Sequence, residues 1–332
     1  MKYIIALLLA LALLVAGCEK KSNNPLTPAA TGASLVLVAN STGNSVSTID
    51  LGADKVTANA LTVGSAPNQV LVAAGMVFVV SSLSNNVMVF DTASLTALGT
   101  INVGDGTNPM NIAVLGAKGY VACWKSNEVR VVNLATRTVT KSIPAGVGTT
   151  GIVAANGKLF ATNSGYDGNG YLPGVVTVIS AASDAVVDTV SVGMNPVAAA
   201  VGPDGNVHVV CTGNYADVPG VVSVIDASTD KVLRTIPIGG APGAIAFAPD
   251  GTAFVGYFSD GMATYNGRSY AIIDSVTHPL LRKGGTGIAV DAQGYIYVAD
   301  FSYDQVYKLD PSRNLVKTYT VGDGPISVAL KP

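Results

Sequence analysis

From about residue 34 onward, apolar side chains recur in short runs separated by turns rich in Gly, Pro, Asn and Asp. One stretch reads Pro196–Val201, then Val207–Cys211, Val221–Asp226 and Lys231–Ile236. Runs rich in Val and Ile between turn residues are typical of β-strands, and the 3.6-residue period of an amphipathic helix is missing. The pattern therefore predicts an all-β chain built from four-stranded units.

Two landmarks divide this region into repeats. A glycine turn recurs at spacings of 40, 42, 47, 46, 45 and 38 residues, at Gly64, Gly104, Gly146, Gly193, Gly239, Gly284 and Gly322. An acid or polar residue ends another β-run in step with it, at Asp50, Asp91, Asn133, Ser180, Asp226, Asn266 and Asp310. Four strands in roughly 40–45 residues is the period of a propeller blade. Both landmarks count seven, so we predict a seven-bladed β-propeller.

Several units share a short motif at the second predicted strand and in the segments around it. The matching segments are Leu37–Asn40, Phe160–Asn163, Tyr297–Asp300, Val201–Gly205, Phe247–Gly251, Val222–Asp226 and Lys231–Ile236. In these segments, residues 34–332 resemble the YVTN-repeat β-propeller family. The resemblance implies a fold and no particular activity. The sixth unit departs from it, because Met262–Asn266 replaces the usual Val-Ile-Asp segment.

The repeat region begins without a first strand and ends with an additional one. Residues 35–38 align with the second strand of a unit, and residues 326–330 align with a first strand. Pairing residues 326–330 with residues 35–39 would remove two open sheet edges. We therefore predict that the C-terminal strand completes the first blade.

The N-terminal segment has the form of a targeting signal. Lys2 precedes an apolar run, Ile4–Ala16, that is too short for a comfortable bilayer span. The run ends in Leu14–Cys18, which resembles the lipobox of bacterial lipoproteins. This resemblance predicts a signal peptide over residues 1–17, acylation (palmitate) of Cys18 and a membrane anchor. Residues 18–33 are predicted to be a flexible tether.

The resemblance also predicts a location. A lipid-anchored chain of this kind lies in the cell envelope and faces the periplasm or the cell exterior. Glu19 follows the acylated cysteine where an Asp would direct retention, so the outer membrane is favoured in a Gram-negative cell.

Charge excludes one class of partner. Charged residues make up 12% of the chain, with 19 Lys and Arg against 21 Asp and Glu, and no segment concentrates the basic ones. Nucleic-acid binding needs a basic patch, so we expect no nucleic-acid partner.

Aligning the second strands gives structural interpretations for the histidines and cysteines. His208 falls in a column of packing residues, namely Leu37, Phe78, Tyr120, Phe160, His208, Phe254 and Tyr297. His278 lies alone in a loop, so no metal site is expected. Cys123 and Cys211 lie two units apart, too far for a disulfide, and are expected to be buried thiols.

The catalytic inventory is poor. Glutamate occurs only at Glu19 and Glu128, and most aspartates occupy repeat turns. The Asp167–Gly170 stretch lacks the third ligand and the glutamate of a calcium loop. We therefore predict no catalytic residue and no cofactor. A hydrolase or lactonase working in the central channel stays an alternative, with Asn40, Asn163 and Asp300 as candidates.

The loops that follow second strands are long in the later units and carry aromatic and acidic residues. Strand alternation places them on one face with the connections between blades, where rigid aromatic rings and hydrogen-bond acceptors suit recognition. We predict a binding or scaffold protein for a glycan, a peptide or an envelope protein. A structural role in the envelope or surface layer stays open. The predicted ligand-binding residues are Trp124, Tyr166, Asp167, Tyr171, Tyr215, Asp217, Tyr257, Asp260, Asp300, Tyr303 and Asp304.

Overall fold

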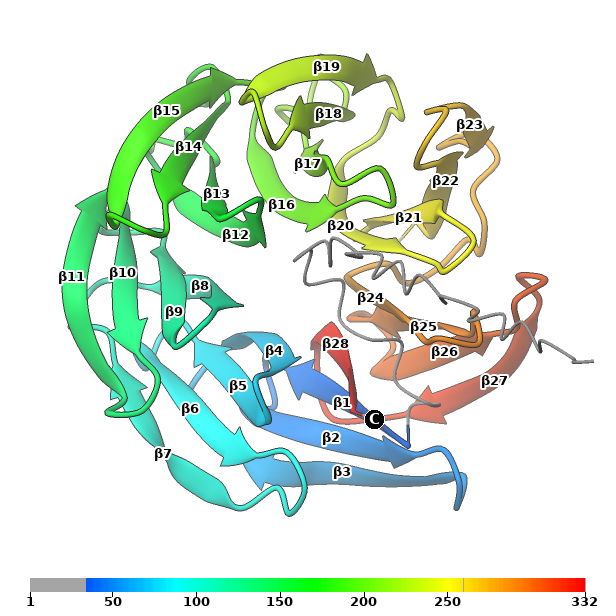
Figure 1. Cartoon of the computed structure of the whole chain (residues 1–332). Helices are drawn as coiled ribbons and strands as arrows, with labels where there is room; N and C mark the ends of the chain where they lie inside the picture. The colour runs from blue at the N-terminus through cyan, green and yellow to red at the C-terminus, as the bar shows by residue number, and fades with distance from the viewer. Residues whose placement is uncertain (1–33, 259, 332) are drawn as a thin grey trace, which may run out of the picture.

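The computed structural model describes residues 34–331 apart from residue 259. They form seven four-stranded antiparallel sheets arranged as blades around a central axis (Figure 1). No helix occurs in this part of the chain. The predicted seven-bladed β-propeller is confirmed.

The strands fall into four concentric sets, in the order blade 1 to blade 7. The innermost strands are β28 (Pro325–Lys331), β4 (Pro67–Ala73), β8 (Pro109–Leu115), β12 (Thr149–Ala155), β16 (Pro196–Val201), β20 (Pro242–Phe247) and β24 (Gly287–Val290). The second strands are β1 (Leu35–Asn40), β5 (Met76–Ser81), β9 (Lys118–Cys123), β13 (Lys158–Asn163), β17 (Val207–Cys211), β21 (Thr252–Tyr257) and β25 (Ile296–Asp300). The third strands are β2 (Ser45–Asp50), β6 (Asn86–Asp91), β10 (Glu128–Asn133), β14 (Val175–Ser180), β18 (Val221–Asp226), β22 (Met262–Asn266) and β26 (Gln305–Leu309). The outermost strands are β3 (Lys55–Thr62), β7 (Ala97–Asn102), β11 (Thr138–Pro144), β15 (Ala185–Ser191), β19 (Lys231–Ile236), β23 (Ile272–Asp274) and β27 (Leu315–Thr320).

The first blade is closed by the last strand, as predicted. β28 pairs antiparallel with β1, with Val36 opposite Leu330 and Val38 opposite Val328. Its sheet order is β28-β1-β2-β3, so the two ends of the described chain meet in one sheet. The unusual sixth unit forms a blade as well, but its outermost strand β23 has only three residues.

Apolar side chains between neighbouring blades form the core. The predicted packing column is buried in all seven blades, with Tyr120, Phe160 and Tyr297 fully so. His208 is also fully buried: its Nδ1 lies 2.7 Å from the Tyr265 hydroxyl and its ring is 4.9 Å from that of Phe247. The prediction that His208 replaces a core aromatic residue is confirmed.

The propeller has two faces, which we name by their connections. The loop face consists of the connections between blades and the loops after second strands. These loops are residues 41–44, 82–85, 124–127, 164–174, 212–220, 258–261 and 301–304. The turn face, on the opposite side, consists of the turns after innermost strands and after third strands.

On the turn face, the turn after each third strand leans on the preceding blade. A residue near its end has a left-handed φ of 50–70° in every blade, and we call it the turn-end residue: Asp54, Leu95, Arg137, Asp184, Asp230, Tyr270 and Arg313. Between blades 3 and 4, Asp184 accepts a hydrogen bond of 2.8 Å from the Tyr120 hydroxyl and pairs with Lys118 at 2.7 Å. Between blades 5 and 6, the Tyr270 hydroxyl donates to Asp204 at 2.8 Å. Polar contacts at these turns thus join neighbouring blades.

The outermost strands are interrupted by β-bulges. In every blade the pairing of the third and outermost strands shifts register near the middle. Bulges of this kind bend an edge strand and hinder its pairing with another sheet. The extra residues include Val187, Leu233 and Val316, all exposed. The innermost strands are covered by their neighbours in the ring, whereas the outermost strands are open edges that the bulges protect.

No described segment forms a helix long and apolar enough to cross a bilayer. The predicted signal peptide, Cys18 and the tether lie outside the described residues.

Ring closure can be tested by truncation. A chain that ends at residue 324 lacks β28 and leaves β1 and β24 without their neighbour in the ring. We expect its thermal midpoint to fall by about 10 °C or more, because several kcal/mol of burial and pairing are lost and each kcal/mol shifts the midpoint of a domain this size by a few degrees. A Leu98→Ser variant, altered on an exposed outer strand, should melt like the parent chain. A truncated chain with an unchanged midpoint would contradict the closure argument.

Candidate functional site

Backbone hydrogen bonds hold the loop face together. The loops after second strands bond to the connection that enters the same blade, as in Trp124 N–H to Asn108 O and Ser164 N–H to Gly148 O, both 2.9 Å. The repeat glycines allow this close approach. A Cβ on Gly146 would lie 2.7 Å from Asn163 Cγ, and one on Gly193 would lie 2.9 Å from Cys211 Cβ. The glycine landmark in the sequence therefore marks where a connection crosses the end of a second strand.

A large apolar side chain stands on this face in each of blades 2 to 7. Leu83, Tyr215 and Tyr303 expose 69%, 68% and 68% of their surface. Phe258, Leu172 and Tyr166 expose 54%, 43% and 40%, and Trp124 is half-buried. Where such side chains lie close together and form a patch, they mark an interaction site.

Three tyrosines form a cluster across blades 4 and 5. The ring centroids of Tyr166 and Tyr171 are 5.3 Å apart, and those of Tyr171 and Tyr215 are 6.2 Å apart. The rings are tilted relative to one another, which is favourable for aromatic pairs. Burial is the main cause that raises the pKa of Tyr171, and electrostatic interaction with Tyr215 and Tyr166 raises it further. We call Tyr166, Tyr171 and Tyr215 the tyrosine cluster.

Two aspartates flank the tyrosine cluster as stable anions. Asp167 accepts hydrogen bonds from the backbone N–H groups of Asn169 (2.8 Å) and Gly170 (3.1 Å), which lower its pKa. The Asn214 amide donates to Asp217 at 2.7 Å and likewise lowers the pKa of that carboxyl. Both carboxylates remain exposed, so each combines a negative charge with free acceptor positions beside the rings.

A second aromatic pair spans blades 6 and 7. The rings of Phe258 and Phe301 are 5.2 Å apart. Neither residue was among the predicted binding residues, and Leu83 and Leu172 were missed as well. Phe258 and Phe301 directly follow the end of a second strand, so that position in the repeat was the available signal.

Two predicted binding residues need correction, because they are buried. Tyr257 is 2% exposed, and its hydroxyl donates to Ile238 O at 3.0 Å. Asp300 is 1% exposed and accepts from the Tyr307 hydroxyl at 2.7 Å and from Ser302 N–H at 3.1 Å. Both end second strands, and their side chains brace the blade instead of facing solvent.

The remaining predicted residues lie on the loop face but not in one group. Tyr303 and Asp260 are exposed. Trp124, in blade 3, lies against Gly148 in the connection that enters blade 4. Asp304 is half-buried and accepts from Gly324 N–H at 2.8 Å. The structure thus brings together the tyrosine cluster with Asp167 and Asp217, and distributes the others around the ring.

The candidates for a channel enzyme are also occupied by structural contacts. Asn163 is fully buried and bonds to Thr149 and Thr177, and Asn40 is fully buried against the hydroxyls of Ser45 and Ser47. Within the seven innermost strands, Lys331 is the one ionisable residue. Among the described residues, no group of three or more His, Cys, Asp or Glu is placed to hold a metal ion.

Cys123 and Cys211 are both free and fully buried. Burial raises the pKa of each thiol to about 12. A thiol with a raised pKa is neutral at ordinary pH, and the neutral form is a poor nucleophile.

These cysteines should therefore resist modification. In the native protein at pH 8, we expect neither Cys123 nor Cys211 to react with an aromatic disulfide reagent within an hour. Both should react within minutes in 6 M guanidinium, which serves as the control. Rapid labelling of either residue in the native protein would contradict its placement in the core.

No protein-family model and no curated protein sequence matches the chain. Solved structures do match it. Proteins described as "putative 6-phosphogluconolactonase" from Bacteroides fragilis and Bacteroides uniformis are each 15% identical, with TM-scores of 0.68 and 0.69. The alignments cover 89% of this chain in both cases, and 97% and 98% of those chains. Kuenenia stuttgartiensis hydrazine synthase is 17% identical over 79% of this chain and 88% of that chain, with a TM-score of 0.66.

At such low identity the likeness shows a shared fold and says nothing about activity. The propeller is thus supported by its structural neighbours. Membership of the YVTN-repeat family stays a prediction.

Proposed function

We propose that the protein is a lipid-anchored binding protein of the cell envelope that holds a protein or glycan partner on its loop face. The observation that carries the proposal is the series of large apolar side chains on the loop face of six consecutive blades, exposed in five of them and half-buried at Trp124 in blade 3. Aromatic residues are enriched at protein interfaces, where a few buried rings supply most of the affinity. Polar atoms of Asp167 and Asp217 beside the tyrosine cluster would add directional hydrogen bonds.

The charge of the loop face narrows the partner. Exposed or half-exposed acids there, Asp105, Asp167, Asp217, Asp260, Asp304 and Asp323, outnumber the bases Lys125, Arg282 and Lys283. A polyanion would be repelled by this surface. The partner we propose is therefore neutral or basic where it contacts the protein, which again disfavours nucleic acid.

The position of the N-terminal strand supports presentation of this face. β1 begins at Leu35, which pairs with Asp50 and lies at the turn face. It ends at Asn40, which lies at the loop face. With Cys18 acylated, the turn face would lie toward the membrane and the loop face away from it.

The lactonase alternative is less well supported. The structural neighbours described as lactonases share the fold at 15% identity. Acyl hydrolysis needs a general base or a metal-bound water, and the innermost strands supply no carboxylate or imidazole toward the channel. The geometry therefore favours binding over catalysis.

Site-specific crosslinking tests the binding face. A photo-crosslinking amino acid at position 215 should give a discrete covalent adduct in intact cells, whereas the same group at position 233, on an exposed outer strand, should give none. Replacing Tyr166 and Tyr171 with Ala should weaken the adduct about thirtyfold, because two rings that each contribute roughly 1 kcal/mol to such contacts together contribute about 2 kcal/mol. Equal adducts at 215 and 233, or an adduct indifferent to the two alanines, would reject the proposed face and leave a structural envelope role.

The anchor has a test of its own. A Cys18→Ala variant should lose incorporation of labelled palmitate and move from the membrane fraction to the soluble fraction, since a lipid chain gains about 0.8 kcal/mol per buried CH₂. A Cys123→Ser variant keeps Cys18 and should retain both label and membrane attachment. Membrane attachment of the Cys18→Ala variant would show that something other than the lipid holds the protein.

A further inference from the structure

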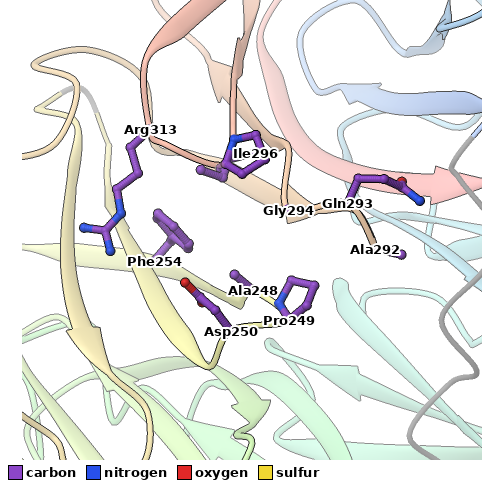
Figure 2. A pocket seen from close by; sticks show the side chains of 10 residues that line it. Ala248, Pro249, Asp250, Phe254, Ala292, Gln293, Gly294, Ile296 and Arg313 are labelled. Atoms are coloured by element: carbon purple, nitrogen blue, oxygen red, sulfur yellow. The ribbon is translucent and has the colours of Figure 1, made fainter.

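A cavity of about 160 Å³ opens on the turn face between blades 6 and 7. Its walls are the turns at residues 248–250 and 292–294, with Pro311 and Arg313 from the last turn of blade 7. Phe254 and Ile296 form its apolar floor. Figure 2 shows Arg313, Phe254 and Asp250 near one another at one end of the lining, with Gln293 and Ala292 at the other end. The cavity lies on the opposite side of the propeller from the tyrosine cluster.

The junction of blades 6 and 7 differs from that of blades 3 and 4. Tyr120, in the second strand of blade 3, has a hydroxyl that meets the turn-end residue Asp184. The equivalent residue of blade 6 is Phe254, which has no hydrogen-bonding group. Its turn-end neighbour Arg313 instead reaches Asp274 on the short outermost strand β23, with Nη1 3.3 Å from Oδ2. The guanidinium lies over the Phe254 ring, which is 2% exposed, and the cavity opens beside it between the two turns.

The chemistry of the lining defines a ligand. An engineered apolar cavity of about 150 Å³ admits benzene, so this one has room for a phenyl ring. Arg313 supplies a fixed positive charge, and its carbon Cζ lies 5.9 Å from the centroid of the Phe254 ring. Among the described residues, the guanidinium hydrogen-bonds to one side chain, Asp274, and Arg313 also lines the cavity. Guanidinium groups bind carboxylates through paired N–H donors.

We propose that this cavity is a binding site for a small aromatic carboxylate. The ring enters between the two turns, against Ala248, Pro249 and Pro311, and the carboxylate accepts hydrogen bonds from Arg313. The site does not rest on the loop face and is independent of the partner proposed there. A ligand of about eleven heavy atoms at ordinary ligand efficiency binds with a Kd near 1 mM or tighter.

The test uses 3-phenylpropionate as the probe and saturation-transfer NMR or calorimetry on the whole chain. The acid should bind, and 3-phenylpropylamine, which carries the opposite charge on the same ring, should not. Arg313→Gln should weaken binding of the acid at least tenfold. Arg137→Gln is the matched control, because Arg137 is the turn-end residue of blade 3, has the same left-handed backbone and lies beside Gly99 instead of lining this cavity.

A second variant keeps the result interpretable if Arg313→Gln disturbs the turn. Ala248→Leu places extra carbon atoms in the cavity and should abolish binding while the melting curve stays cooperative. Equal affinity for the acid and the amine, equal affinity in the Arg313→Gln and Arg137→Gln variants, or undiminished binding to Ala248→Leu would each overturn the proposal.

Discussion

The pairing of β28 with β1 is the constraint on which the other features depend. An open row of seven sheets would expose an innermost strand at each end, whereas the closed ring gives every innermost strand two neighbours. Closure also places both ends of the described chain on the turn face, because Leu35 lies opposite Lys331. Neither end of residues 34–331 therefore lies on the loop face, and its loops can vary without interrupting the ring.

Much of this architecture was predictable because it repeats. The packing column that contains Tyr120, Phe160 and His208 follows from aligning the second strands, and the structure buries every member. Closure followed from the phase of the two terminal strands. The glycine landmark has an equally direct cause, since a side chain at Gly146 would collide with Asn163. Features enforced in every blade leave a periodic trace in the sequence.

Features that belong to one blade or to two blades together left no such trace. Tyr257 and Asp300 resemble their exposed neighbours in composition, and only the pleat at the end of a strand turns them inward. The Phe258–Phe301 contact joins residues from different repeats, so no single repeat reveals it. The cavity beside Arg313 adjoins β23, the shortest outermost strand of the described residues, which the repeat pattern does not reveal. The exposed tyrosines, in contrast, were predictable from the expansion of their loops.

The two faces differ in how far a change of a binding residue affects the packing between blades. On the loop face, residues such as Tyr215 are added beyond the strand ends, so a change there leaves the packing between blades intact. On the turn face, the residue that would bind a ligand, Arg313, also joins two blades through its contact with Asp274. Tyr270 joins the preceding pair of blades through Asp204. A ligand held by Arg313 would join blades 6 and 7, as the hydrogen bond from Tyr270 to Asp204 joins blades 5 and 6. Binding on that face is therefore coupled to the stability of blades 6 and 7, because a ligand that binds only the folded form shifts the folding equilibrium toward it.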